Sequence, residues 1–234
     1  MQSVTAQNHI SSYYAATAND RTRYPALEGT VKADVCVIGG GFSGVATALT
    51  MAERGRSVVL LEANRIGWGA SGRNGGQMIG GISGEAAIER QLGKAGAKLV
   101  RDIRYRGHEI IEERIAKYAI ACDLKHGWIE VAARPRHMRA MRAHVEERIG
   151  EGEGGHLEII EPDEMRRVLG TSAYHGGFID RRSGHLHGLN LCLGEARAAA
   201  GLGVQIFEGT RAIALEGGAK PWVQTERGRV EAGT

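Results

Sequence analysis

The chain has 234 residues, 42% hydrophobic and 24% charged, a composition that describes an ordinary globular protein with one large domain or two small ones. A formal net charge of +3, with basic and acidic residues interspersed, argues against nucleic-acid binding, and no stretch approaches the ~20 apolar residues of a membrane span. The three cysteines are far apart and form no C-x-x-C, which argues against a disulfide framework or a zinc site and predicts a reducing, cytoplasmic location.

The first organised segment follows a polar, irregular stretch, residues 1–30, which we expect to form an N-terminal arm. Four apolar residues at 35–38 predict a buried parallel strand, because such strands are covered on both faces. The strand leads directly into G-x-G-x-x-G at Gly39, Gly41 and Gly44, followed by an amphipathic helix. In this pattern the glycines permit a tight turn, the close approach of a pyrophosphate and close packing of helix on strand. The N-terminus of the helix then offers free N–H groups to phosphates.

A second buried strand, residues 57–61, ends at Glu62, which stands 18 residues after Gly44. At that position a carboxylate can accept hydrogen bonds from the hydroxyls of a ribose. The alternative is an accidental glycine turn, with Glu62 as a solvated charge. The order of strand, glycine turn, helix, strand and acid favours a dinucleotide-binding β-α-β unit.

Residues 66–77 are too rich in glycine for a helix or a strand, and they follow the predicted ribose-binding carboxylate. Loops of this length inside a compact domain are usually functional or disordered. Ser71 and Asn74 can form hydrogen bonds, and Arg73 can bind anionic oxygens. A flexible glycine linker is the alternative, which Trp68 disfavours.

The remainder of the chain alternates between helical and strand patterns. We expect helices over 85–120, 136–148 and 189–201, a short helix opening at 161–164, and strands over 124–131, 157–160, 174–180, 204–207, 211–215 and 222–225. Residues 204–207 have the spacing of a third strand in a doubly wound sheet. The fold class expected is α/β (α+β overall): a Rossmann-like domain with an inserted, incomplete α+β substrate domain. The expected bounds are 1–30 for the arm, 31–120 and 184–234 for the cofactor domain, and 121–183 for the insertion.

Four stretches together match one known pattern: Ser12–Ala16, Asp34–Gly41, Gly69–Gln77 and Gly184–Leu191. On these residues the chain resembles the FAD-dependent amine and amino-acid oxidoreductases of the D-amino-acid oxidase superfamily, in particular their gamma-glutamylputrescine oxidase branch. The resemblance extends over essentially the whole chain. Its most specific part is the G-A-S-G-R-N-G-G-Q stretch.

The resemblance implies a cofactor, FAD, held without a covalent bond, since we expect no cysteine or histidine near the 66–77 loop as an attachment point. It also implies a set of cofactor-binding residues: Ile38, Gly39, Gly41, Phe42, Ser43, Gly44, Glu62, Ala63, Ala70, Ser71, Arg73, Asn74, Gly75, Gly76, Gln77 and Ala212. It assigns no catalytic residue. His185 and His187 match the family's G-H-x-H pattern without a defined role, and we expect no metal there because no third ligand is evident.

The activity implied by the resemblance is oxidation of a small-molecule primary or secondary amine to an imine and then an aldehyde or keto product, with dioxygen reduced to hydrogen peroxide. Family members continue well beyond the position of Thr234, so the resemblance predicts that this chain is an amino-terminal fragment. It leaves open whether the fragment alone turns over a substrate. Two alternatives remain at this point. One is a non-catalytic flavin-binding remnant, and the other is an NAD-linked dehydrogenase.

Overall fold

The computed structural model describes residues 6–234, so residues 1–5 of the expected arm lie outside the described part. Contacts divide the chain into two units. The first comprises Met1–Gly76, Glu113–Cys122 and His187–Thr234, and the second comprises Gln77–Glu112 and Asp123–Leu186. The second unit therefore interrupts the first in sequence. Its bounds differ from the expected ones, because residues 77–112 group with the insertion rather than with the first unit.

The first unit contains a three-stranded parallel sheet in the order β2-β3-β8. Its strands are β2 (Val35–Ile38), β3 (Val58–Leu61) and β8 (Gln205–Phe207), and its helices are α2 (Phe42–Glu53) and α7 (Gly188–Gly201). The expected third strand of the sheet is present, next to the second. Gly55, with a φ of 73°, follows α2, as expected for a helix that ends at a glycine.

A second sheet of the same unit has the order β1-β11-β10-β9. It consists of β1 (Gly29–Ala33), β9 (Ala212–Glu216), β10 (Trp222–Thr225) and β11 (Gly228–Ala232). β1 pairs in parallel with β11 along its whole length, although the two lie at opposite ends of the chain. Neither strand was expected, and the start of β1 falls in the predicted irregular arm. A five-residue strand with two apolar residues, as β1 and β11 each have, carries too little pattern of its own to be recognised without its partner.

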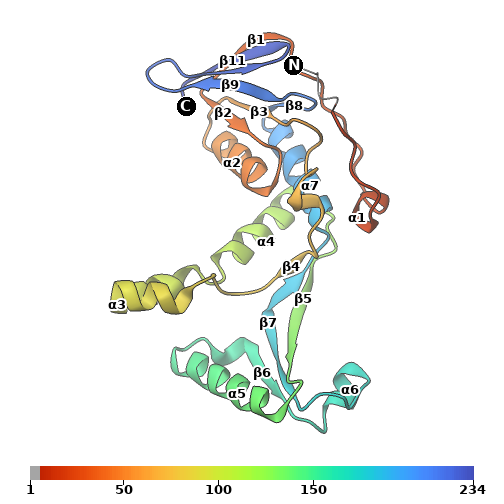
Figure 1. Cartoon of the computed structure of the whole chain (residues 1–234), viewed down its shortest axis with the longest axis vertical. Coiled ribbons are helices and arrows are strands. Elements are labelled where there is room, and N and C mark those ends of the chain that lie inside the picture. The colour runs from red at the N-terminus through yellow and green to blue at the C-terminus, as the bar shows by residue number, and fades with distance from the viewer. Residues whose placement is uncertain (1–5) are drawn as a thin grey trace. The chain divides into compact units, whose positions relative to one another are not determined.

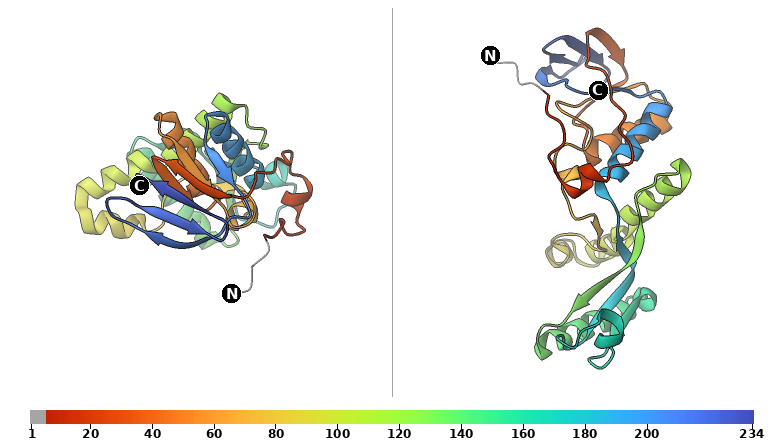
Figure 2. Two further views of the ribbon diagram at one scale, coloured as in Figure 1. Left: turned by 90° about the horizontal axis from the view of Figure 1, so that it is seen from above. Right: turned by 90° about the vertical axis from the view of Figure 1, so that its right-hand side faces the viewer.

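The core of the first unit explains the uninterrupted apolar run in β3, which is buried on both faces. Val58 and Leu60 pack with α2 and α7, whereas Val59 and Leu61 pack with Val223 and other residues of the second sheet. Figure 1 shows the resulting layers, with α2 and α7 on one side of the parallel sheet and the second sheet on the other; Figure 2 gives two further views.

The second unit is built on β7 (Gly177–His185), which pairs along one edge with β5 (Lys125–Val131). Its other edge pairs with β6 (Leu157–Ile160) and β4 (Gln77–Met78). The other elements of this unit are α3 (Glu85–Ile103), α5 (Pro135–Gly150), α6 (Met165–Leu169) and the first turns of α4 (Arg106–Tyr118). The apolar face of α5 packs on Phe178 of β7, as its methionine spacing predicts.

Two expected elements were wrong in extent. The single helical stretch over 85–120 is two helices, α3 and α4, and Gly93 inside α3 has a non-helical φ of 59°. β7 continues to His185 instead of ending at residue 180, so His185 lies in a strand and not in a loop. Within residues 6–234, no helix has both the length and the apolar character needed to cross a bilayer.

Candidate functional site

The candidate site begins where the three parallel strands of the first unit end. Gly39 follows β2, Glu62 follows β3 and Glu208 follows β8, so all three lie at the carboxyl edge of the sheet. In open α/β sheets ligands bind outside this edge. The sequence analysis predicted the first two residues and missed Glu208.

The glycine turn has the geometry that the fingerprint predicts. Gly39 has a φ of 104°, which an L side chain rarely adopts, and its N–H donates to Leu61 O at 2.8 Å. A Cβ on Gly44 would lie 1.8 Å from Gly39 O, so only glycine lets α2 approach β2 this closely. Gly41 is the N-cap of α2, and no side chain of its own caps the helix. The turn therefore places glycine backbone at the positive end of a 12-residue helix, which fits a pyrophosphate, although the Gly40 and Phe42 N–H groups already donate to Glu62 and Ser71.

Glu62 is bonded to this turn through one carboxylate oxygen and to its own segment through the other. Oε2 accepts the Gly40 N–H at 2.7 Å, and Oε1 accepts the Asn64 N–H at 2.7 Å. These bonds orient the carboxylate, and each oxygen keeps lone-pair capacity for a further donor such as a ribose hydroxyl. Glu62 is thus no solvated strand-end charge.

The 66–77 loop is fastened to the glycine turn by Ser71, in a 3₁₀ turn at Ala70–Gly72. Ser71 Oγ accepts the N–H of Phe42, the first residue of α2, at 2.9 Å. Asn74 organises the loop itself, because its amide donates to Ser71 O at 2.8 Å and accepts the Gly76 N–H at 2.8 Å. The loop is therefore an ordered part of the unit and not a linker.

Arg73 is held away from the turn by its own loop. Its Nε donates to Trp68 O at 2.9 Å, and its guanidinium lies 4.3 Å from the centroid of the Trp68 ring. The remaining predicted residues are placed as follows: Ile38 ends β2, Ser43 is exposed in the first turn of α2, Ala63 follows Glu62, Ala70 begins the 3₁₀ turn, Gly75 and Gly76 end the loop, Gln77 begins β4 in the second unit, and Ala212 begins β9.

The N-terminal arm is bonded to the start of this loop. Gln7 N–H donates to Asn64 Oδ1 at 2.9 Å, His9 Nε2 lies 2.9 Å from Ile66 O, and Trp68 Nε1 donates to Asn8 O at 3.0 Å. The sequence analysis expected an irregular arm and could not foresee these bonds, because they join residues about sixty positions apart.

His187, left without a role by the sequence, has a structural one. Its Nδ1 accepts the Asn190 N–H at 3.0 Å and so caps α7, which places its proton on Nε2, 3.0 Å from Thr17 Oγ1. The ring also packs edge-on against Tyr14 of α1 (Tyr13–Ala16). These contacts join the arm to α7.

The expectation that no cysteine or histidine lies near the 66–77 loop was wrong, because His9 Nε2 lies 2.9 Å from Ile66 O and a cysteine is close as well. Cys192 on α7 lies beside the glycine turn, with its Sγ 3.6 Å from Gly40 O, and a Cβ added to Gly67 would lie 3.5 Å from the same sulfur. The thiol is fully buried, and burial raises its pKa. A neutral, buried thiol is a poor nucleophile, so this cysteine is no evident attachment point.

Ser71→Ala is expected to weaken FAD binding on the order of tenfold and to weaken ADP binding less. The hydroxyl holds the loop on α2, and a hydrogen bond of this kind contributes roughly 0.5–1.5 kcal/mol. ADP shares the pyrophosphate that would lie at the N-terminus of α2, where Ser71 bonds the Phe42 N–H, but it has no flavin half for the rest of the loop to contact. Titration of both ligands measures the difference, and Ser57→Ala is the matched control, because Ser57 Oγ accepts the Asp34 N–H at 2.8 Å at the other end of the sheet. Equal losses for FAD and ADP would contradict this role.

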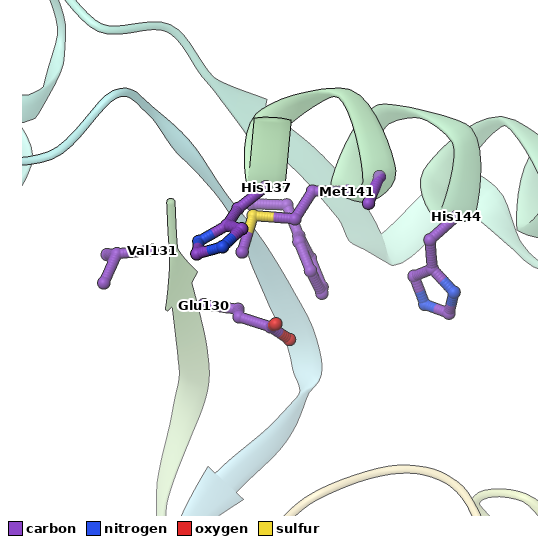
Figure 3. Close-up of a pocket in the computed structure, with 7 residues that line it drawn as sticks. Glu130, Val131, His137, Met141 and His144 are labelled. Atoms are coloured by element: carbon purple, nitrogen blue, oxygen red, sulfur yellow. The ribbon is translucent and has the colours of Figure 1, made fainter. Parts of the chain in front are cut away.

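The second unit contains a pocket of about 440 Å³ between α5 and the β5–β7 edge, drawn in Figure 3. It is lined by Glu130, His137, His144, Met141 and Phe178, among others. Figure 3 shows His137 and Met141 near Glu130, whereas His144 lies further along the helix. In the described part of the chain no three His, Cys, Asp or Glu residues are placed to hold a metal ion, and this pocket is no exception.

A buried polar cluster in the same unit surrounds Tyr105. Its hydroxyl lies 2.8 Å from His156 Nε2 and donates to Asp180 Oδ2 at 3.0 Å. Burial raises the pKa of Tyr105 and lowers that of His156, so the phenol stays protonated and the imidazole neutral. The Ser183 hydroxyl also bonds Asp180. The sequence offered no signal for this cluster.

Comparisons with known proteins point to one family. The profile of the DAO family, FAD dependent oxidoreductase, matches residues 34–233. The chain is 38% identical over 227 residues to gamma-glutamylputrescine oxidoreductase of Escherichia coli K12, covering 96% of this chain and 53% of that protein. It is 41% identical over 205 residues to probable oxidoreductase OrdL of Haemophilus influenzae, covering 86% and 47%. The chain spans about half the length of the curated relatives it matches.

Solved structures agree with this fold. An L-amino acid deaminase from Proteus vulgaris, lacking its specific insertion sequence, superposes with a TM-score of 0.73 at 25% identity, covering 93% of this chain and 55% of that one. A glycine oxidase from Bacillus cereus superposes with a TM-score of 0.70 at 22% identity, covering 86% and 53%, and shows the fold alone. The predicted α/β fold class is confirmed.

Proposed function

The chain belongs to the DAO family of FAD-dependent oxidoreductases, and from this premise we propose that it binds FAD non-covalently and forms part of an enzyme that oxidises a primary or secondary amine. The relative named for gamma-glutamylputrescine motivates a substrate of that kind, with an amino acid as the other candidate class. One observation carries the proposal. The glycine turn, the oriented Glu62 carboxylate and the anchored 66–77 loop meet at the carboxyl edge of the sheet.

The residues present fit the cofactor. Bare backbone at Gly39 to Gly44 and the N-terminus of α2 would hold the pyrophosphate. Glu62 would accept the adenosine ribose hydroxyls, and the start of β9 at Ala212 would lie near the adenine. The 66–77 loop would lie along the flavin half.

Bound FAD supplies the acceptor for a hydride equivalent from the carbon next to the amine nitrogen, and dioxygen takes up the two electrons and two protons as hydrogen peroxide. The protein's own part is to bind and orient. Ser71 holds the loop in position, and Asn74 keeps the loop's shape by bonding within it. The imine product then hydrolyses to the aldehyde or keto compound in water.

The test is a binding and turnover assay on the purified chain. A flavin spectrum after loading with FAD, followed by peroxide release with gamma-glutamylputrescine, sarcosine or a D-amino acid, supports the whole proposal. Flavin binding without turnover of any of these amines would favour the non-catalytic alternative. Binding of NADH and never of flavin would overturn the proposal.

Any FAD bound by the chain should be released by acid precipitation into the supernatant. The reason is that Cys192, the cysteine beside the glycine turn, is buried and its thiol pKa is raised, so it cannot readily form a thioether. Absorbance of the supernatant and the pellet measures the partition. Yellow colour that stays with the pellet would contradict non-covalent binding.

A further inference from the structure

The first unit contains a buried carboxylate, Glu208, whose oxygens join three separate segments. The side chain is 4% exposed. Its Oε1 accepts the Ile66 N–H at 2.8 Å, and its Oε2 accepts the Tyr24 N–H at 3.0 Å. The guanidinium of Arg65 lies 2.5 Å from Oε2 and also donates to Thr22 O at 3.0 Å. The arm, the segment after β3 and the segment after β8 therefore meet at one charge.

The backbone around Glu208 continues the same junction. Its N–H donates to Pro25 O at 3.1 Å, and the next two N–H groups, of Gly209 and Thr210, donate to Asn64 O at 3.0 Å and Glu62 O at 2.9 Å. Glu62, which would bind the ribose, is thus held in register with the segment that leads to Ala212. Glu208 itself is buried at this edge, with both carboxylate oxygens bonded within the protein.

The segment held by Glu208 also determines the position of the glycine turn. The Gly67 N–H donates to Gly40 O at 2.8 Å. Ile66 is fully buried over the same glycine, where an added Cβ on Gly40 would lie 2.6 Å from Ile66 Cδ1. A shift of residues 65–67 would therefore move both Gly40 and Glu62.

We propose that Glu208 is a positioning residue for the adenosine diphosphate half of the cofactor: it acts through Ile66 and Arg65 on the Gly40 turn and the Glu62 carboxylate without touching the cofactor. This inference rests on the proposed function, because it presumes that FAD occupies this edge. A buried ion pair is by itself weak evidence for stability, since the desolvation of both charges opposes their attraction. The carboxylate here additionally accepts two backbone N–H groups from segments that converge on the site, which gives the pair a positional role.

A second buried ion pair in the same unit provides a matched control. Glu195 on α7 is 3% exposed and pairs with Arg114 at 2.8 Å, and Arg114 is 11% exposed against 13% for Arg65. Arg114 also donates to Thr50 Oγ1 of α2 at 2.7 Å. This pair joins α4 and α7 to the middle of α2, and it makes no hydrogen bond to the glycine turn after β2 or to the segments after β3 and β8. Glu208→Gln and Glu195→Gln each remove one buried negative charge, but only Glu208 is bonded to the segments that converge on the site.

The experiment compares Glu208→Gln with Glu195→Gln in the full chain, with ADP and FAD affinities from calorimetric titration and thermal unfolding of the ligand-free protein. We expect both variants to lower the unfolding midpoint. Glu208→Gln should weaken ADP and FAD about equally, on the order of tenfold, whereas Glu195→Gln should leave both affinities within about twofold of wild type. Equal loss of ADP and FAD affinity also distinguishes Glu208 from Ser71, whose substitution should weaken FAD more than ADP.

Unchanged ADP and FAD affinities in Glu208→Gln, with only the midpoint lowered, would show a purely structural role and overturn the inference. A wild-type chain that binds neither ligand would instead overturn the proposed function. Arg65→Lys is a milder variant, in case Glu208→Gln does not fold. It keeps a cation beside Glu208 but loses the guanidinium bond to Thr22 O, and should weaken ADP about threefold. Wild-type ADP affinity in Arg65→Lys would also count against the inference.

Discussion

Gly44→Ala should reduce FAD affinity by at least about a hundredfold and destabilise the first unit. The new Cβ would lie 1.8 Å from Gly39 O and 3.0 Å from its carbonyl carbon. Backbone cannot yield as a flexible side chain can, so α2 must move away from β2. Overpacking of this kind costs about 1–3 kcal/mol, occasionally more, and a displaced α2 would no longer present its N-terminal N–H groups to a pyrophosphate at the geometry that the glycine turn gives.

Titration with FAD measures the loss of affinity, and thermal unfolding measures the loss of stability. Gly201→Ala is the matched control, since Gly201 ends α7 in the same unit and a Cβ there meets nothing within 4 Å. It should leave FAD affinity unchanged. If Gly44→Ala bound FAD like wild type, the close approach of α2 to β2 would be irrelevant to the cofactor and the assigned site would be wrong.

Glu62→Gln should weaken both FAD and ADP by tenfold to a hundredfold. The charged carboxylate would accept two ribose hydroxyls, and hydrogen bonds to charged groups contribute roughly 1.5–3 kcal/mol each, partly offset by desolvation. The structure adds a second reason. Both oxygens already accept backbone N–H groups, so the amide nitrogen of a glutamine must face either Gly40 N or Asn64 N, donor against donor.

Asp34→Asn is the control for this substitution. Asp34 Oδ2 accepts the N–H and the hydroxyl of Ser57, both at 2.8 Å, at the amino end of the same sheet, and these bonds lower the pKa of Asp34. It therefore loses a comparable charge and comparable bonds at a distance from the site. Calorimetric titration of ADP tests both variants, and ADP affinity lost equally in both would show that general loosening of the sheet explains the result.

The β-α-β segment at residues 35–62 could be predicted from the sequence, because the features that determine it are local. An apolar run, three glycines at fixed spacing, a helical period and a second apolar run occupy residues 35–62. Each is a property of neighbouring residues: steric freedom at Gly39, close packing at Gly44, and burial of β3 on both faces. For that reason β2, α2, β3 and the position of Glu62 were predicted correctly.

The same local reasoning failed where local patterns were weak. The apolar residues over 85–120 recur with helical spacing and so predict one continuous helix. Their spacing does not reveal the non-helical Gly93 or the break between α3 and α4. β1 and β11 carry few apolar residues and exist because they pair with each other, one near each end of the chain. Their pairing is a tertiary fact that no window of sequence contains.

The sequence by itself therefore determined the residue types of the candidate site, the glycine turn with its positive φ and the class of cofactor that the family implies. Only the tertiary structure decided how these parts are held. Ser71 reaches Phe42 across 29 positions, and Glu208 reaches Ile66 across 142 and Tyr24 across 184. A hydrogen bond depends on an atomic distance, and folding brings atoms together irrespective of their separation along the chain. Glycine's freedom of rotation, in contrast, belongs to the residue itself and can be recognised wherever it stands.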